Sequence, residues 1–388
     1  MARFTVTDIR KIAALLICTL LLFSANGLQA TLAPVRAELG GFSTMAIGWI
    51  GTAFFIGFVA GCLIVPKLLQ ILGHVRTFAL LTAAAATALL LHPMEVSVPV
   101  WTALRAVMGF CAAGMYAIVE GWLNHQATNA IRGRVFTTYA TLNALALIVG
   151  NAFFAQGDPA SAQMFIWVSV LTIACLVPIA VTRQPEPPKP SRVRIRVWRL
   201  FGAAPAGFAG AACSGLAGGA FWALAMNFAQ AQGFDQGGVA WFMSAVIFGG
   251  ALAQWPVGRI SDLMDRRIVI MLAAFGATLA SLALAVAPAF GDAAPVVTFA
   301  AAMLFGASSF PIGSLANAHM NDRSHAGDVS ETATAILLIS GSSAGLGTLL
   351  GAQAMNVAGP AGLFYYIAVV HVSLVAFVVT RIAQRPPE

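Results

Sequence analysis

Residues 41–61 read GFSTMAIGWIGTAFFIGFVAG, and residues 233–253 read GFDQGGVAWFMSAVIFGGALA. At an offset of 192 positions, five identical residues align: Gly41 with Gly233, Phe42 with Phe234, Trp49 with Trp241, Ala53 with Ala245 and Gly57 with Gly249. Both stretches are long and apolar, and both open on Gly-Phe. The match predicts an internal repeat, in which each half of the chain carries a related span in second position.

The composition around these stretches excludes an ordinary water-soluble domain. Hydrophobic residues make up 59% of the chain and charged residues 9%, whereas soluble domains carry roughly a quarter charged residues. A lipid bilayer is the solvent that suits such a chain. We therefore expect an all-α membrane protein with twelve transmembrane helices in two pseudo-symmetric six-helix bundles.

Twelve apolar runs are long enough to cross a bilayer, which takes about 20 residues. They span approximately 11–33, 44–66, 77–93, 98–122, 135–155, 162–182, 202–228, 238–257, 268–288, 295–317, 332–354 and 361–381. Arg3, Arg10 and Lys11 precede the first run, as in a signal peptide. No small-x-small cleavage site follows, so we interpret this run as the first span.

The basic residues predict the orientation of these spans. With the N-terminus inside, 19 of the 21 Lys and Arg residues fall in inner segments, Arg36 falls outside and Arg105 falls within the membrane. Such a bias is typical of cytoplasmic loops. We expect a multi-pass protein of the cell inner membrane with both termini cytoplasmic. The net charge of +7 is then juxtamembrane charge, and nucleic acid is not an expected partner.

The longest inner segment lies near the midpoint of the chain. Residues 183–199 read RQPEPPKPSRVRIRVWR, which is basic and rich in proline. This composition predicts a linker. The expected domains are an N-terminal six-helix bundle (1–182), a cytoplasmic linker (183–200) and a C-terminal six-helix bundle (201–388).

Several motifs resemble those of the major facilitator superfamily. GRISDLMDRR, residues 258–267, resembles its loop signature G-x-L-x-D-R-x-G-R-R, although Leu263 and Asp265 depart from it. The copy in the first half, PKLLQILGHVR at 66–76, is more degraded. Arg105, followed four residues later by glycine, resembles the superfamily's span-4 motif. The resemblance implies a secondary transporter that works by alternating access.

Four finer motifs resemble the YcaD-like branch of that superfamily. They are EGWLN at 120–124, RGR at 132–134, SLANAHMNDR at 314–323 and GLFYYIAVVH at 362–371. This branch is similar to some bacterial riboflavin importers. The resemblance implies import of a small solute, with riboflavin or a similar vitamin as the first substrate to consider. An efflux carrier for drugs or metabolites is the alternative.

Neutral amides and aromatic residues within the spans suit a flat solute that forms hydrogen bonds. The substrate-binding candidates are Asn26, Gln29, Arg105, Tyr116, Asn143, Phe221, Trp222 and Asn227. An arginine inside a span usually faces a partner or a water-filled cavity. For Arg105 we weigh substrate binding or proton coupling against snorkelling to the interface.

A second set of charged residues lies near the inner ends of the spans and is expected to form a gate. The gating candidates are Arg76, Glu120, Arg134, Asp262 and Arg266. The superfamily resemblance implies that Asp262 meets the N-terminal end of span 5, near Gly133 and Arg134. For Glu120 we expect Arg76 or His74 as the partner. No carboxylate is expected near the middle of any span.

Other classes of function find less support in the sequence. The five cysteines form no CxxC or Cys/His cluster, and no Walker motif occurs. We expect no catalytic residue, no cofactor and no metal site. A membrane-embedded lipid-modifying enzyme would need a convergent acid or histidine cluster, and HMNDRSHAGD at 319–328 is the nearest to one. The expected partners are a small-molecule substrate and the lipid bilayer, and the chain is expected to function as a monomer.

Overall fold

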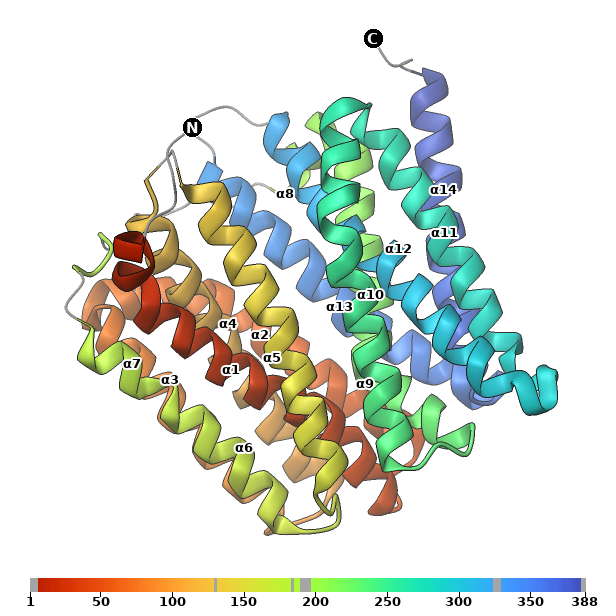
Figure 1. The fold of residues 1–388 in the computed structure, drawn as a ribbon, viewed down its shortest axis with the longest axis horizontal. Coiled ribbons are helices and arrows are strands. Elements are labelled where there is room, and N and C mark those ends of the chain that lie inside the picture. Colours follow the sequence, from red (N-terminus) through yellow and green to blue (C-terminus); the bar gives the residue numbers. More distant parts are fainter. Residues whose placement is uncertain (1–5, 129–130, 183–184, 189–196, 324–328, 385–388) are drawn as a thin grey trace. The chain divides into compact units, whose positions relative to one another are not determined.

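The computed structural model describes residues 6–128, 131–182, 185–188, 197–323 and 329–384, and within these ranges the regular elements are helices (Figure 1). In chain order they are α1 (Val6–Leu39), α2 (Thr44–Leu72), α3 (His74–Leu91), α4 (Val98–Gln126), α5 (Arg132–Gln156), α6 (Ala162–Ala174), α7 (Leu176–Val181), α8 (Val197–Ala203), α9 (Pro205–Ala231), α10 (Gln236–Leu263), α11 (Arg266–Val286), the 3₁₀ turn η1 (Ala287–Ala293), α12 (Ala294–Asp322), α13 (Val329–Ala358) and α14 (Gly362–Gln384).

The expected membrane spans are confirmed. Eleven helical segments among the described residues are long and apolar enough to cross a membrane. One of them, Arg266–Asp322, contains two expected spans, α11 and α12, joined by η1. Gly291 within η1 has a φ of +56°, a conformation that glycine adopts without the steric cost of a side chain. The described part of the chain therefore contains twelve span-length segments.

The sixth span is broken where the sequence reading expected one continuous run at 162–182. It consists of α6 and α7, with Cys175 between them. Pro178 lies in α7, four residues after Ala174, the last residue of α6. A proline removes the hydrogen bond to the residue four positions earlier and crowds its carbonyl. This local chemistry accounts for the break.

The repeat between the halves is confirmed in the backbone. Gly41 and Gly233, which align in the sequence, have φ values of +77° and +81°. The aligned pair Gly57 and Gly249 also share a role, because a Cβ at Gly57 would collide with the carbonyl oxygen of Ala106, and a Cβ at Gly249 with that of Met303. Glycine thus allows α2 to approach α4 and α10 to approach α12.

The helix packing repeats as well. α1 packs on α5 and α9 packs on α13, while α3 contacts α6 as α11 contacts α14. Glycines again set the closest approaches: Gly27 lies against the backbone of Leu147, and Gly219 against that of Ala344. The repeated sequence therefore encodes a repeated arrangement of helices.

Two compact units make up the chain. The first contains residues 1–40 and 56–191, and the second contains residues 41–55 and 192–388. The beginning of α2 thus belongs with the second unit, where the Thr52 hydroxyl donates a 2.9 Å hydrogen bond to the carbonyl of Gly345.

Part of the expected linker is held by the first unit. The Trp122 indole donates a 3.0 Å hydrogen bond to the carbonyl of Pro185. Glu186 accepts a 3.0 Å hydrogen bond from the backbone N–H of His74, at the start of α3. Residues 183, 184 and 189–196 of the expected linker lie outside the described residues. α8 occupies residues 197–203, most of which precede the expected span at 202–228, and α9 begins only at Pro205.

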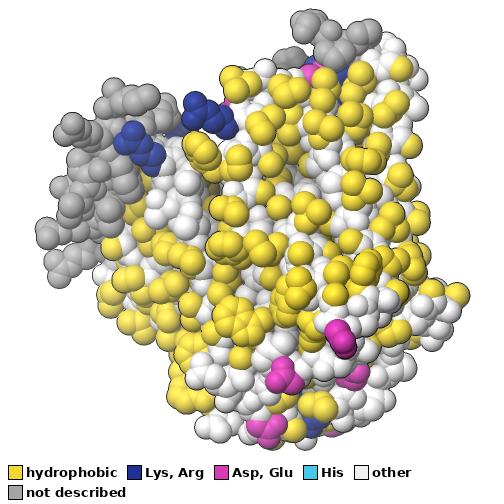
Figure 2. Space-filling view, turned by 45° about the vertical axis from the view of Figure 1, so that its right-hand side comes forward, with side chains coloured by type: hydrophobic (Ala, Val, Ile, Leu, Met, Phe, Trp, Pro, Cys, Tyr) yellow, Lys and Arg dark blue, Asp and Glu magenta, His cyan; other side chains and the backbone are white. Residues whose placement is uncertain are grey.

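The surface is that of a protein surrounded by lipid. Figure 2 shows a face rich in hydrophobic side chains, with most of its visible Asp and Glu side chains near the lower end. Large apolar residues are exposed on many helices, including Trp49 at 52% and Trp241 at 70%. Exposure on this scale is unfavourable in water and favourable in a bilayer. The chain is a multi-pass membrane protein.

Candidate functional site

Three of the candidates in the first unit lie along one face of α4. Arg105, Tyr116 and Glu120 follow one another at intervals of eleven and four residues. At 3.6 residues per turn they point within about 60° of one another. Arg105 and Tyr116 are half-buried, and Glu120 is exposed. One side of α4 therefore presents a cation, a phenol and a carboxylate in sequence.

Aromatic side chains from α1 and α5 contact the C-terminal part of this face, at Tyr116 and Glu120. The ring of Phe23 stacks on Tyr116, with 4.9 Å between centroids and an angle of 12° between planes. Tyr139 approaches Phe23 edge-on at 6.1 Å, and its hydroxyl donates a 2.8 Å hydrogen bond to Oε1 of Glu120. The structure thus brings together Phe23, Tyr116, Glu120 and Tyr139 from three helices.

The prediction that Glu120 pairs with Arg76 or His74 was wrong. The Glu120 carboxylate bonds to Tyr139, whereas His74 lies 3.5 Å from the carboxylate of Glu186. α4 continues to Gln126, four residues beyond the expected end of span 4, so Glu120 lies six residues inside the helix. This is about 9 Å along its axis. A tyrosine in an apolar run needs a partner for its hydroxyl, and this rule could have identified Tyr139.

The amides of the first unit lie beside this cluster. Asn143 is four residues after Tyr139 and shares its side of α5. Its buried Oδ1 atom has no hydrogen-bond partner among the described residues. On α1, Asn26 is half-buried and lies three residues after Phe23. Gln29 is buried and donates a 3.3 Å hydrogen bond to the sulfur of Met108, which places the Arg105 region of α4 next to α1.

The candidates of the second unit lie on α9 and divide into two groups. Phe221 is fully buried, and Trp222 is half-buried. Their ring centroids are 5.5 Å apart, and Phe310 lies 6.0 Å from Trp222. Phe221 and Phe310 therefore both pack against the half-buried Trp222. Asn227 is five residues later, about 140° around the helix, and is 7% exposed.

A further amide, Gln230, lies closer to the Trp222 side of α9. Gln230 follows Trp222 by eight residues, about 80° around the helix. It is half-buried, and its Oε1 atom has no hydrogen-bond partner among the described residues. The sequence offers a signal for it, because it is an amide at the end of the same apolar run as Asn227.

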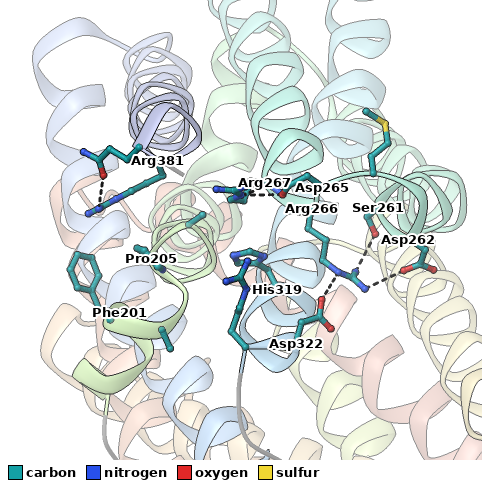
Figure 3. Close-up of a pocket in the computed structure, with 16 residues that line it drawn as sticks. Phe201, Pro205, Ser261, Asp262, Asp265, Arg266, Arg267, His319, Asp322 and Arg381 are labelled. Carbon is teal, nitrogen blue, oxygen red and sulfur yellow. Dashed lines mark hydrogen bonds and ion pairs between the residues drawn. The ribbon is translucent and has the colours of Figure 1, made fainter. Parts of the chain in front are cut away.

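Two gating candidates of the second unit lie in a charged cluster (Figure 3). Arg266 forms ion pairs with Asp262 at 3.2 Å and with Asp322 at 2.7 Å. The adjacent Arg267 pairs with Asp265 at 2.6 Å. Because Arg267 donates to its carboxylate, the pKa of Asp265 lies below its ordinary value. Asp262 remains 69% exposed.

Besides Glu120, the gating candidates of the first unit are at helix ends. Arg76 is exposed in the first turn of α3, and Arg134 is exposed in the first turn of α5. The gating roles, like the expected approach of Asp262 to α5, remain predictions.

The stretch considered for an enzyme, residues 319–328, begins in the last turn of α12. Within the described ranges, no three His, Cys, Asp or Glu side chains are placed to hold a metal ion. Of the stretch 319–328, His319 is buried at the end of α12 and Asp322 pairs with Arg266. Residues 324–328 lie outside the described residues.

Comparisons with solved structures show the fold. The nucleoside transporter NupG superimposes with a TM-score of 0.78 at 13% identity, over 97% of this chain and 99% of NupG. A D-xylose–proton symporter gives a TM-score of 0.74 at 12% identity, over 96% of this chain and 97% of the symporter.

Sequence comparisons show the family. An uncharacterised MFS-type transporter of Yersinia enterocolitica is 27% identical over 71% of this chain and 74% of its own length. The uncharacterised MFS-type transporter YcaD of Escherichia fergusonii is 27% identical over 72% of this chain and 75% of its own length. Residues 15–352 match the family described as Major Facilitator Superfamily. The chain therefore belongs to the major facilitator superfamily and is a secondary transporter.

Proposed function

We propose that this carrier imports a small, flat and mostly uncharged solute by alternating access, with riboflavin or a similar vitamin as the first candidate. The proposal places the protein in the bacterial inner membrane, as a monomer with both termini in the cytoplasm. The distribution of basic residues supports that orientation.

The observation that carries the proposal is the polar face of α4 with its neighbours. Arg105 and Glu120 supply one positive and one negative charge on the same face. Near them lie the phenols of Tyr116 and Tyr139 and the unbonded amide oxygen of Asn143. Balanced charges favour a solute without net charge. A buried acceptor that lacks a donor favours a solute carrying N–H or O–H groups.

The second unit supports the flat shape of the solute. Trp222 is half-buried and is held by Phe221 and Phe310. A supported indole offers a rigid apolar face for an aromatic ring. Gln230 on the same helix offers a further acceptor. An isoalloxazine ring with its polyol tail has the flat face and the donors that these groups require.

Growth complementation tests the substrate. A riboflavin-requiring strain that lacks its own importer should grow at micromolar riboflavin when it expresses the wild-type chain. Asn143→Ala removes one acceptor, which costs about 1–3 kcal/mol and should weaken uptake roughly 5- to 150-fold. If the strain does not grow although the protein is present in the membrane, flavins are excluded as substrates, and only the assignment as a carrier of some small solute stands.

The inner gate is proposed on the charged residues Arg76, Glu120, Arg134, Asp262 and Arg266. Asp262 is the informative member, because its 69% exposure leaves it accessible while Arg266 is already neutralised by Asp322. In this proposal Asp262 stabilises one transport state through the positive end of α5.

A further inference from the structure

A pocket of about 1050 Å³ lies in the second unit, where the ends of α10, α12 and α14 meet the start of α9. It is lined by four arginines, Arg266, Arg267, Arg323 and Arg381, together with His319 (Figure 3). None of the substrate-binding candidates lines it. Its volume is at the upper end of the range for drug-sized ligands.

Two of these arginines are neutralised by carboxylates of the pocket itself. Arg266 binds Asp262 and Asp322, and Arg267 binds Asp265 through two nitrogen atoms. These pairs fix the framework of the pocket and leave one excess negative charge, because three carboxylates face two guanidinium groups.

The other two arginines have no carboxylate within ion-pair distance among the described residues. Arg381 donates a 3.1 Å hydrogen bond to the neutral Gln384 and lies 5.0 Å from the ring centre of Phe377. Arg323 follows His319 by four residues at the end of α12. With four arginines and three aspartates, the lining carries a net charge of +1 when His319 is neutral, and the two guanidinium groups outside the ion pairs are available to an anion. Guanidinium groups match the oxygens of a phosphate with paired hydrogen bonds.

The pocket also has an apolar side. Phe201 of α8, Pro205 and Met264 belong to its lining. Trp198, one turn before Phe201 on α8, is 80% exposed. Exposed aromatic residues beside basic groups are typical of the level of lipid headgroups. A bare phosphate would leave most of this volume empty.

We propose that this pocket binds a phosphate ester with an apolar portion, supplied by an anionic phospholipid of the surrounding membrane. Arg323 and Arg381 hold the phosphate, and Phe201 contacts the apolar portion. Basic pockets between helix ends are a general mode of headgroup recognition. The proposal uses the second unit alone and does not depend on the solute carried.

Native mass spectrometry of the full chain in neutral detergent tests this proposal. Wild-type protein should retain phosphatidylglycerol in preference to phosphatidylcholine. Arg323→Gln and Arg381→Gln should each weaken that retention about 10-fold or more, as expected for the loss of charge-assisted hydrogen bonds. The matched control is Arg259→Gln, because Arg259 is exposed on α10, lies 5.6 Å from the Trp255 ring and does not line the pocket.

A soluble probe distinguishes the source of the phosphate. If glycerol 3-phosphate displaces phosphatidylglycerol and binds by itself, the site is confirmed and its ligand is a soluble phosphate ester. Phe201→Ala should weaken phospholipid retention and leave glycerol 3-phosphate unaffected. If Arg381→Gln does not fold, Arg381→Lys replaces it in the test. Because lysine keeps the charge, this variant should weaken phosphatidylglycerol retention less than Arg323→Gln does. Equal retention of both lipids, or retention unchanged in both arginine variants, overturns the proposal.

Discussion

The hydroxyl of Tyr139 on α5 donates a 2.8 Å hydrogen bond to Oε1 of Glu120 on α4. Tyr139 is buried, while Glu120 is exposed. The bond therefore fixes a carboxylate at the edge of the protein interior, about a turn and a half from the end of α4. Because Phe23 contacts both Tyr139 and Tyr116, this pair anchors the polar face on which the proposed solute would bind.

A double-mutant cycle on this pair should give a measurable coupling. Tyr139→Phe removes the hydroxyl, and Glu120→Gln removes the charge. A hydrogen bond to a charged group is worth about 1.5–3 kcal/mol, so the two variants together should destabilise less than the sum of each alone. Chemical unfolding in detergent measures this. Tyr365→Phe is the control, since Tyr365 is 42% exposed. Strict additivity would show that the bond contributes nothing to stability.

Arg105 should be required as an arginine. It shares the face of α4 with Tyr116 and Glu120, and a lysine would supply the charge without the planar fork of donors. Arg105→Lys and Arg105→Ala should both lose most transport while the purified protein remains folded. Normal uptake by both variants would identify Arg105 as a snorkelling or bracing residue.

Asp262→Asn should reduce transport with little loss of stability. Its pair with Arg266 is exposed, and exposed ion pairs contribute about 0–1 kcal/mol. The measurement is uptake per folded molecule, and Asp292→Asn, an exposed carboxylate of η1, serves as the matched control. Wild-type uptake in Asp262→Asn would count against the inner gate.

Asp265 should contribute stability that depends on pH. Its pKa is lowered in the folded protein by the hydrogen bonds from Arg267. The contribution is therefore complete above the unfolded pKa of about 3.9 and is lost as the pH falls through the lower folded value. Asp265→Asn keeps a helix-capping side chain and removes the charge. The gap in melting temperature between the wild type and this variant should be constant above pH 4 and shrink below it. A gap that persisted unchanged at lower pH would refute this assignment.

The repeated glycines should be intolerant of a methyl group. Gly57→Ala and Gly249→Ala each introduce a Cβ into a facing carbonyl, so both should lower the yield of folded protein. Gly121→Ala, where a Cβ would meet nothing within 4 Å, should not. Equal yields for all three would contradict the proposed basis of the repeat.

The sequence predicts the fold well because membrane spans depend on average composition. Length and hydropathy suffice to place α1, α9 and the other spans. The repeated glycines Gly41 and Gly233 mark two positions where the backbone adopts a positive φ. The bond between Tyr139 and Glu120 could not be placed in this way. It depends on how far α4 continues past its apolar run and on which side chains of α5 turn toward it. Likewise, hydropathy gives no sign of the break at Cys175, which Pro178 causes.

The pocket in the second unit depends even more on tertiary structure. Arg323 and Arg381 are 58 residues apart, and each alone resembles an ordinary juxtamembrane charge. Arg323 and Arg381 stand out as possible anion ligands only because Arg266 and Arg267 are paired with Asp322, Asp262 and Asp265. Pairing of charges between separate helix ends cannot be inferred from spacing along the chain.

Counterflow in proteoliposomes is the most direct test of the central claim that the chain carries a flat, neutral solute on its polar and aromatic faces. Vesicles loaded with unlabelled riboflavin should take up external labelled riboflavin faster with the wild-type protein than without it. Asn143→Ala and Trp222→Ala should both slow this exchange, and Tyr365→Phe should not. Exchange no faster than in protein-free vesicles, with folded carrier present in the membrane, would contradict the claim.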